Sequence, residues 1–144
     1  MTEAAPPTRL EIAQRFLLHL GHRGAEESME LLSPDVSYRV PGRHALSGTF
    51  AGREKVKQHL RDLDEAARGT FEATKWEDWL VGEHYVAAVA SFTANAGGRL
   101  LATRVLYLVR FDVAGLIAGI EVYFGDESSP SRFFGPPAAP DAEG

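Results

Sequence analysis

The sequence of 144 residues contains no cysteine, which excludes disulfides, thiolate nucleophiles and zinc sites with cysteine ligands. It also lacks basic runs, and its formal net charge of −5 gives no electrostatic reason to expect a nucleic-acid partner. The apolar runs are too short to span a bilayer, and residues 1–7 lack the basic and apolar regions of a signal peptide. We therefore expect a cytoplasmic protein with neither a nucleic-acid nor a membrane partner.

Several motifs that mark well-known chemistries are missing as well. The sequence has no Gly-x-Ser-x-Gly elbow, no phosphate loop, no Gly-x-Gly-x-x-Gly turn and no His-Glu-x-x-His pair. His19 and His22 are close in sequence, but two histidines without a third ligand do not indicate a metal site. The sequence therefore predicts no metal and no cofactor.

What is present indicates one globular domain. The chain is 44% apolar and 24% charged, and a chain of this length can bury a core of its own. Residues 1–7 are predicted to form a flexible arm, and residues 8–127 the domain. Residues 128–144 are rich in Ser, Pro, Ala and Gly and are predicted to be mostly disordered. The alternative is that Phe133 and Phe134 fold back over the domain or its pocket.

Three helices are predicted in the first half of the chain. Thr8 and Glu11 form a Thr-x-x-Glu capping box before an apolar run, which predicts a helix over 8–20. A short helix follows over 25–32 and is expected to end at Ser33-Pro34-Asp35. A third helix is predicted over 53–67, where apolar residues recur at helical spacing.

The rest of the chain alternates like strands and breaks at turn residues. The predicted strands are 36–40, 70–80, 84–93, 100–112 and 116–124. Consecutive strands with short connections indicate an antiparallel sheet with the helices on one face, and therefore an α+β fold. In the strand 100–112 both faces are apolar, with Tyr107 on one and Leu106 and Leu108 on the other. A second copy of the chain is the simplest cover for the outer face, so we expect a homodimer.

One segment resembles a known family. From Tyr38 to Val56 the chain reads YRVPGRHALSGTFAGREKV. A second segment, residues 109–126, covers the last two predicted strands and carries the resemblance as well. These segments resemble the SnoaL-like polyketide cyclase group of the NTF2-like, ketosteroid isomerase-like superfamily, over about Thr8 to Asp126. The resemblance implies a cone-shaped fold in which a curved antiparallel or mixed sheet wraps around three N-terminal helices and encloses a pocket.

The resemblance also allows the isomerase chemistry to be tested residue by residue. The catalytic base of ketosteroid isomerases falls on Val40 of this chain, the oxyanion tyrosine on Phe16 and the protonated aspartate on Tyr107. The isomerase machinery is therefore absent, and the fold alone does not fix the reaction.

The inward faces predict a largely apolar pocket. We expect its substrate-binding residues to be Phe16, Tyr38, Val40, Trp76, Phe92, Val105, Val122 and Phe124. Tyr107 is the first candidate catalytic residue, either as a hydrogen-bond donor to a substrate carbonyl or as a core tyrosine bonded to backbone. His59 is the second, either as an acid or base or as a histidine on the flank of a helix. Trp76 and Trp79 have opposite strand parity, so only one is expected to face inward.

Together with this pocket, the resemblance to the SnoaL-like group implies a cofactor-independent cyclase or isomerase of polyketide-type, antibiotic biosynthesis. Holding an apolar polyketide-like molecule in a reactive shape lowers the barrier to ring closure, for example in an intramolecular [4+2] cycloaddition. One alternative is an aldol or Michael-type cyclase with His59 as the base. The other is a binding module of the same fold that catalyses nothing.

Overall fold

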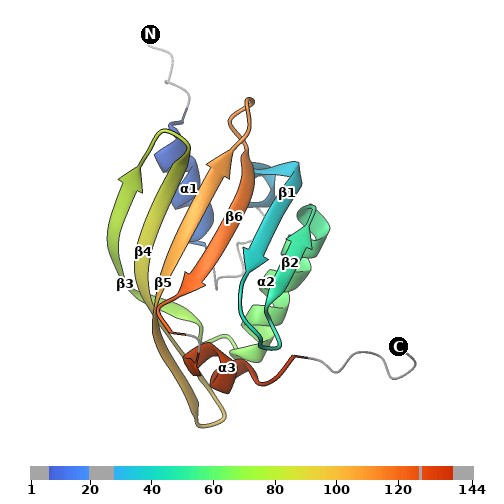
Figure 1. The fold of residues 1–144 in the computed structure, drawn as a ribbon, viewed down its shortest axis with the longest axis vertical. Coiled ribbons are helices and arrows are strands. Elements are labelled where there is room, and N and C mark those ends of the chain that lie inside the picture. The colour runs from blue at the N-terminus through green and yellow to red at the C-terminus, as the bar shows by residue number, and fades with distance from the viewer. Residues whose placement is uncertain (1–6, 20–27, 127, 138–144) are drawn as a thin grey trace, which may run out of the picture.

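The structure is a computed structural model that describes residues 7–19, 28–126 and 128–137. Its elements are α1 (Arg9–Leu17), β1 (Leu32–Val40), β2 (Gly48–Ala51), α2 (Arg53–Ala66), β3 (Glu72–Val81), β4 (Tyr85–Ala96), β5 (Arg99–Phe111), β6 (Ile117–Phe124) and α3 (Ser128–Phe134). The strands form one six-stranded sheet in the order β2-β1-β6-β5-β4-β3 (Figure 1). Only β1 and β6 pair in parallel, so the sheet is mixed.

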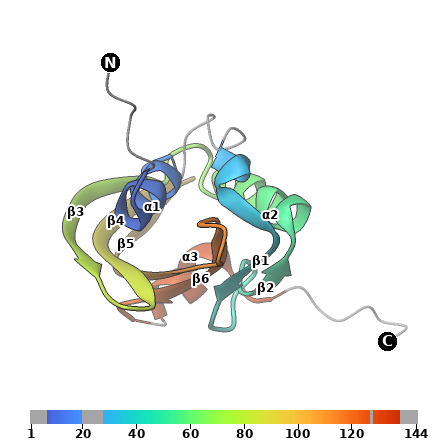
Figure 2. The ribbon, with the colours of Figure 1, turned by 90° about the horizontal axis from the view of Figure 1, so that it is seen from above.

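The sheet is strongly curved, and α1 and α2 lie across its concave side (Figure 2). This confirms the α+β class and the curved mixed sheet. The predicted set of three N-terminal helices is not confirmed, because the described part of the chain ahead of β1 forms a single α-helix, α1. α2 follows β2, and α3 follows the whole sheet.

The capping box of α1 forms as predicted. The Thr8 hydroxyl accepts from the Glu11 N–H at 3.1 Å, and the Glu11 carboxylate accepts from the Thr8 N–H at 3.1 Å. Two orphan N–H groups of the first turn are thereby satisfied, which fixes where the helix begins. α1 then buries Phe16 and Leu17 against the sheet. Leu20, at the end of the predicted helix, lies outside the described residues.

The helix predicted over 25–32 is wrong at its end. Residues 20–27 lie outside the described part, residues 28–31 form a short 3₁₀ turn, and β1 already begins at Leu32. Pro34 therefore lies within a strand instead of ending a helix. The pairing of β1 with β6 is irregular between Leu32 and Ser37, and such an irregularity tolerates a residue without an N–H.

The strand β2 was missed, because its four residues, Gly-Thr-Phe-Ala, show no apolar alternation. Its pairing with β1 sets Phe50 opposite Tyr38. The four later strands were predicted within a few residues. β4 and β5 meet at Gly97 and Gly98, whose φ angles of 61° and 88° are the left-handed values that a two-residue hairpin turn requires.

The inner side of the sheet forms the core, while the outer side stays partly open in a single chain. Along β5, Val105, Tyr107 and Val109 are buried, whereas Leu106 and Leu108 are half-buried. No described helix is long and apolar enough to cross a membrane.

The prediction of a disordered tail is wrong for residues 128–134, which form α3. Asp126 precedes the helix and accepts from the Ser129 N–H at 2.6 Å, the contact expected at a helix start. Phe133 is 2% exposed, and the Arg99 guanidinium donates to the Phe133 carbonyl at 2.8 Å. The phenylalanine pair therefore folds back onto the domain. Residues 138–144, and residues 1–6 of the predicted arm, lie outside the described part.

Candidate functional site

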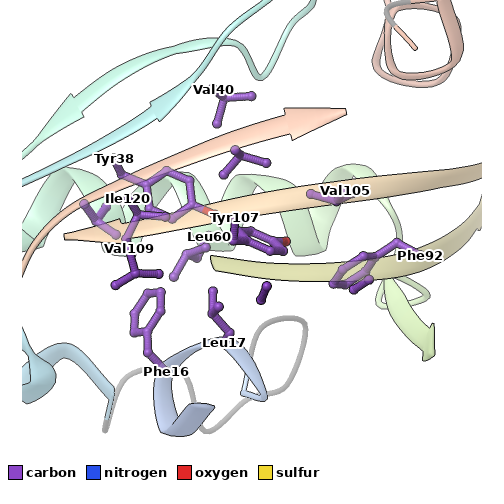
Figure 3. Packing of buried hydrophobic residues seen from close by; sticks show 14 of the residues in the cluster. Phe16, Leu17, Tyr38, Val40, Leu60, Phe92, Val105, Tyr107, Val109 and Ile120 are labelled. Carbon is purple, nitrogen blue, oxygen red and sulfur yellow. The ribbon is translucent and has the colours of Figure 1, made fainter. Parts of the chain in front are cut away.

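The candidate site is the interior between the concave sheet and helices α1 and α2 (Figure 3). All of the residues predicted to line it lie in the core or against it. Those that are buried are Phe16, Tyr38, Val40, Phe92, Val105 and Val122, and those that are partly buried are Trp76 and Phe124. Their binding role stays a prediction, and the structure places all of them in or against one hydrophobic core.

Two tyrosines supply hydroxyl groups to this interior. Tyr38 on β1 and Tyr107 on β5 are separated in the sheet by β6, where they pair with Ile120 and Val122. Each residue is 2% exposed. Neither hydroxyl donates to another described residue, and neither oxygen is one of the fully enclosed unpartnered atoms, which are His44 Nε2 and His59 Nδ1. Burial raises the pKa of both phenols. Both are therefore neutral hydrogen-bond donors at pH 7.

His59, the second predicted catalytic residue, faces inward from α2 and is 4% exposed. Its ring stacks on Phe50 with centroids 4.1 Å apart, and the centroid of Tyr38 lies 5.2 Å away. Its Nδ1 atom is buried without a partner. Burial lowers the pKa of His59 to about 4, so the imidazole is neutral at pH 7 and is a weak base. The alternative of a partly exposed histidine on the helix flank is wrong, because His59 is buried.

His44 is a second buried histidine, and sequence reasoning missed it. It lies in the β1–β2 loop and is 2% exposed. Its Nδ1 accepts from the Leu46 N–H at 3.2 Å, while its Nε2 is buried without a partner. Burial also lowers the pKa of His44. A histidine in a polar, glycine-bearing loop is ordinarily exposed, so nothing in the local pattern could have indicated its burial.

The surroundings of His44 explain its position. Its ring lies 5.2 Å from that of Phe134 on α3 and 6.0 Å, edge-on, from that of Phe124. The Ala45 N–H donates to the Gly135 carbonyl at 3.0 Å, which ties the loop to the end of α3. Gly42, with φ of 118°, leaves room for the ring, because a Cβ there would lie 3.3 Å from His44 Cδ2. A cavity of about 70 Å³ opens between this loop, β6 and Pro130.

No carboxylate joins these groups. The buried polar residues of the described chain are Ser28, Ser33, His44, His59 and Thr103. Glu77 and Glu121 instead form ion pairs with Arg104 and Arg39, residues whose strand positions face outward. The described residues contain no group of three His, Cys, Asp or Glu side chains that could hold a metal, and His22 lies outside them.

A curved mixed sheet with helices on its concave side and an apolar interior defines an NTF2-like protein. Within that class, the SnoaL-like domain family matches residues 13–120, and the chain belongs to this family. The resemblance seen in the sequence is thereby confirmed.

The chain is similar to other proteins in sequence and to solved structures in fold. The chain is 29% identical over 125 residues to the uncharacterized protein Rv0034 of Mycobacterium tuberculosis, over 87% of this chain and 95% of that protein. A Xanthomonas campestris protein of unknown function, described as having a cystatin-like fold, is 26% identical with a TM-score of 0.81, over 90% and 99% of the two chains. TerC, co-crystallized with polyporic acid, is 15% identical with a TM-score of 0.74, over 88% and 97% of the chains.

Proposed function

We propose that this protein is a cofactor-independent cyclase or isomerase that closes a ring in an apolar, carbonyl-bearing molecule of polyketide type. The substrate would lie between the sheet and the helices, with its carbonyl oxygen accepting a hydrogen bond from Tyr107. Tyr38 is a second donor to the same region. The proposal goes beyond the family, whose fold supports isomerases and cyclases in general.

The observation that supports the proposal most is the position of two tyrosine hydroxyls in the core. Tyr38 and Tyr107 are each 2% exposed and belong to the cluster of apolar side chains on the inner face of the sheet. Neither hydroxyl donates to another described residue, so each can donate to a ligand. A carbonyl oxygen would accept such a hydrogen bond, and a donor aimed at developing negative charge stabilises a transition state.

The residues present favour ring closure that needs no strong base. In an intramolecular [4+2] cycloaddition, two carbon–carbon bonds form from π electrons and no proton is transferred. A rigid apolar enclosure that holds the reacting carbons together supplies up to roughly 7–11 kcal/mol of such a barrier. A hydrogen bond from Tyr107 to an activating carbonyl would draw electron density from the acceptor part of the substrate and add to this effect.

The aldol or Michael alternative would use His59 as the base. It is less well supported, because a base whose pKa is about 4 withdraws protons from carbon slowly. The second alternative is a binding module that holds such molecules without converting them. TerC was co-crystallized with polyporic acid, which supports small-molecule binding by this fold without deciding between binding and turnover.

The experiment that separates these functions is a panel of variants assayed on linear polyenes and polyketones, with cyclic products detected by chromatography. We expect Tyr107→Phe to lower kcat by about tenfold to a hundredfold, while the matched control Tyr85→Phe, on an exposed tyrosine, changes nothing. Val40→Trp would fill the interior and abolish turnover.

Two other results would replace the proposal. If His59→Phe abolishes turnover while Tyr107→Phe does not, the acid–base mechanism takes its place. If the protein binds the test compounds tightly and never releases a cyclic product, the binding module is the better description.

The homodimer also stays a proposal. The half-buried side chains of Leu106 and Leu108 form part of the outer face of the sheet, and a second copy covering that face would bury them. Sedimentation equilibrium of the protein and of Leu108→Glu tests this. If the protein is a dimer through this face, the added charge should reduce its mass to that of a monomer. If the unaltered protein already has the mass of a monomer, the homodimer is wrong.

A further inference from the structure

We propose that Arg110 is the centre of a binding site for a small monocarboxylic acid with an apolar body, in a hollow on the outer face of the sheet. Arg110 follows the buried Val109 on β5 and is itself exposed, so its side chain leaves the opposite face from Tyr107 and the candidate site. The inference does not rest on the proposed function.

The position of the hollow follows from the register of four neighbouring strands, β4, β5, β6 and β1 (Figure 1). Arg110 on β5 pairs with Tyr85 on β4 and with Gly119 on β6. Gly119 pairs in turn with Ser37 on β1. Paired residues project from the same face of a sheet, so these four positions form one row across it. Together with the next row they line a hollow of about 280 Å³.

Gly119 makes the room that the Arg110 guanidinium occupies. A Cβ atom at position 119 would lie 2.9 Å from Arg110 Nη2 and 3.4 Å from its Cζ and Nε atoms. The guanidinium therefore lies directly against the backbone of β6, and any side chain at this position would displace it. Glycine in the interior of a strand weakens the strand and often marks a place where another group approaches closely.

The Arg110 guanidinium has no anion within the described part of the chain. Arg39 and Arg104, which also face outward, form ion pairs with Glu121 at 3.3 Å and with Glu77 at 3.0 Å. By contrast, no hydrogen bond or ion pair joins Arg110 to another described residue. Its N–H donors are therefore left for an anion that the described chain does not supply.

The charges around the hollow favour a carboxylate. The planar fork of a guanidinium matches the two oxygens of a carboxylate and binds both of them. Arg39, Arg110 and Glu121 line the hollow and together carry one net positive charge, which suits an anion of one charge. Gly119 and Glu121 are only about 7 Å apart along β6, so Glu121 would repel a doubly charged phosphate or sulfate.

The walls of the hollow favour an acid with an apolar body. Leu108 is half-buried and Tyr85 is 39% exposed, and both border the hollow. An aromatic or short aliphatic group attached to the carboxylate can pack on these two side chains. The volume of about 280 Å³ lies just below that of pockets for drug-sized molecules, about 300–1,000 Å³. The site therefore fits an acid with a single ring, such as benzoate.

The test is a titration of the ¹⁵N-labelled protein with sodium benzoate at constant ionic strength, followed by NMR at the Gly119 amide and its neighbours. Benzyl alcohol is the matched neutral probe, because it keeps the ring and lacks the charge. We expect benzoate to bind in a saturable way and benzyl alcohol to bind at least about tenfold more weakly. Added salt should weaken the binding of benzoate, since exposed charges are screened.

Substitutions then locate the site. Arg110→Gln should weaken the binding of benzoate by about tenfold or more, and Arg110→Lys, which keeps the charge and loses the fork, by about 3-fold. Gly119→Ala should weaken it without any change of charge, because the methyl group displaces the guanidinium. The φ angle of Gly119 is not left-handed, so alanine fits the backbone. Arg104→Gln removes a paired arginine from the same face and is the matched control, with no change in Kd expected.

Sedimentation equilibrium of the same samples separates a free acid from a second copy of the chain, because a homodimer formed through Leu108 would use the same face. If benzoate does not bind and Arg110→Gln converts a dimer to a monomer, Arg110 pairs with a carboxylate of the second copy, and the inference is wrong. It is also wrong if benzoate does not bind and the mass is unchanged. Equal binding of benzoate by Arg110→Gln and Arg104→Gln would place the acid elsewhere on the protein and would overturn the inference as well.

Discussion

The rings of Trp76 and Trp79 stack with their centroids 5.0 Å apart and their planes 21° from parallel. A regular strand would place them on opposite faces, so the expectation that only one faces inward is wrong. The pairing of β3 with β4 shifts register between Ala73 and Lys75 and again between Trp76 and Asp78, and such bulges re-aim side chains. Both tryptophans therefore pack against the core.

This stack provides an optical probe of the interior. Trp76 lies 6.2 Å from Tyr107 between ring centroids, so a ketone bound at Tyr107 should quench its fluorescence. We expect 1-tetralone to quench the emission of the unaltered protein and of Trp79→Phe, but to have little effect on Trp76→Phe. Equal quenching in all three proteins would show that the ketone binds elsewhere or only collides with the surface.

The hydroxyl of Tyr107 predicts an unusual stability result. Tyr107→Phe removes a hydroxyl that makes no hydrogen bond to another described residue, so the free energy of unfolding should stay constant or rise by up to about 1 kcal/mol. Thr70→Val is the contrasting control, because Thr70 Oγ1 donates to the Ala67 carbonyl at 2.6 Å and accepts from the Asn95 N–H at 2.7 Å. That substitution should cost about 1–2 kcal/mol. Urea unfolding of both variants measures these changes. A clear decrease in the free energy of unfolding of Tyr107→Phe would mean that the hydroxyl is hydrogen-bonded in the folded protein.

The buried His59 predicts that stability falls in mild acid. Its folded pKa of about 4 is below the unfolded value of about 6.5, so the unfolded chain binds more protons between these values. The free energy of unfolding therefore decreases as the pH falls from 6.5 toward 4, and His59 accounts for about 2–3 kcal/mol of that decrease. The lowered pKa of His44 acts in the same direction.

The measurement is urea unfolding at pH 7.5 and pH 4.5, for the unaltered protein and for His59→Phe. We expect a smaller loss of stability in the variant, by about 2 kcal/mol, and no such change in the exposed control His84→Phe. An equal loss in all three proteins would show that His59 titrates normally in the fold.

The contact of α3 with the sheet predicts that this helix is part of the stable domain. Phe133→Ala removes a ring that is 2% exposed and lies under the Arg99 guanidinium, 5.6 Å from the ring centroid. We expect a loss of about 3 kcal/mol, against a change within about 0.5 kcal/mol for Leu100→Ala, which is 73% exposed. Thermal or urea unfolding measures both. If Phe133→Ala leaves the free energy of unfolding unchanged, residues 128–134 are only loosely attached to the domain.

Much of the fold followed from local patterns in the sequence. The capping box at Thr8, the helical spacing over 53–67 and the strand alternation after residue 70 each depend on neighbours within a few residues. The capping box, α2 and the strands β3 to β6 all formed. The inward face of β5, with Tyr107 at its centre, followed from strand parity alone. The prediction of disorder failed for residues 128–134, because their helix is stabilised by contacts with Arg99 and with the core. Those contacts join residues that are far apart in the sequence.

The sequence by itself determined the family, the inward strand faces and the absence of cysteine chemistry, because these depend on residue type and short-range periodicity. Only the tertiary structure decided that His44 is buried, because its loop is closed by Phe134 of α3 and by Phe124 of β6. It also decided that Trp76 and Trp79 share a face, since the bulges depend on pairing with β4. The lack of a hydrogen bond at His44 Nε2 and His59 Nδ1 is likewise a property of the assembled core, where burial and the distance to other polar groups determine which hydrogen bonds form.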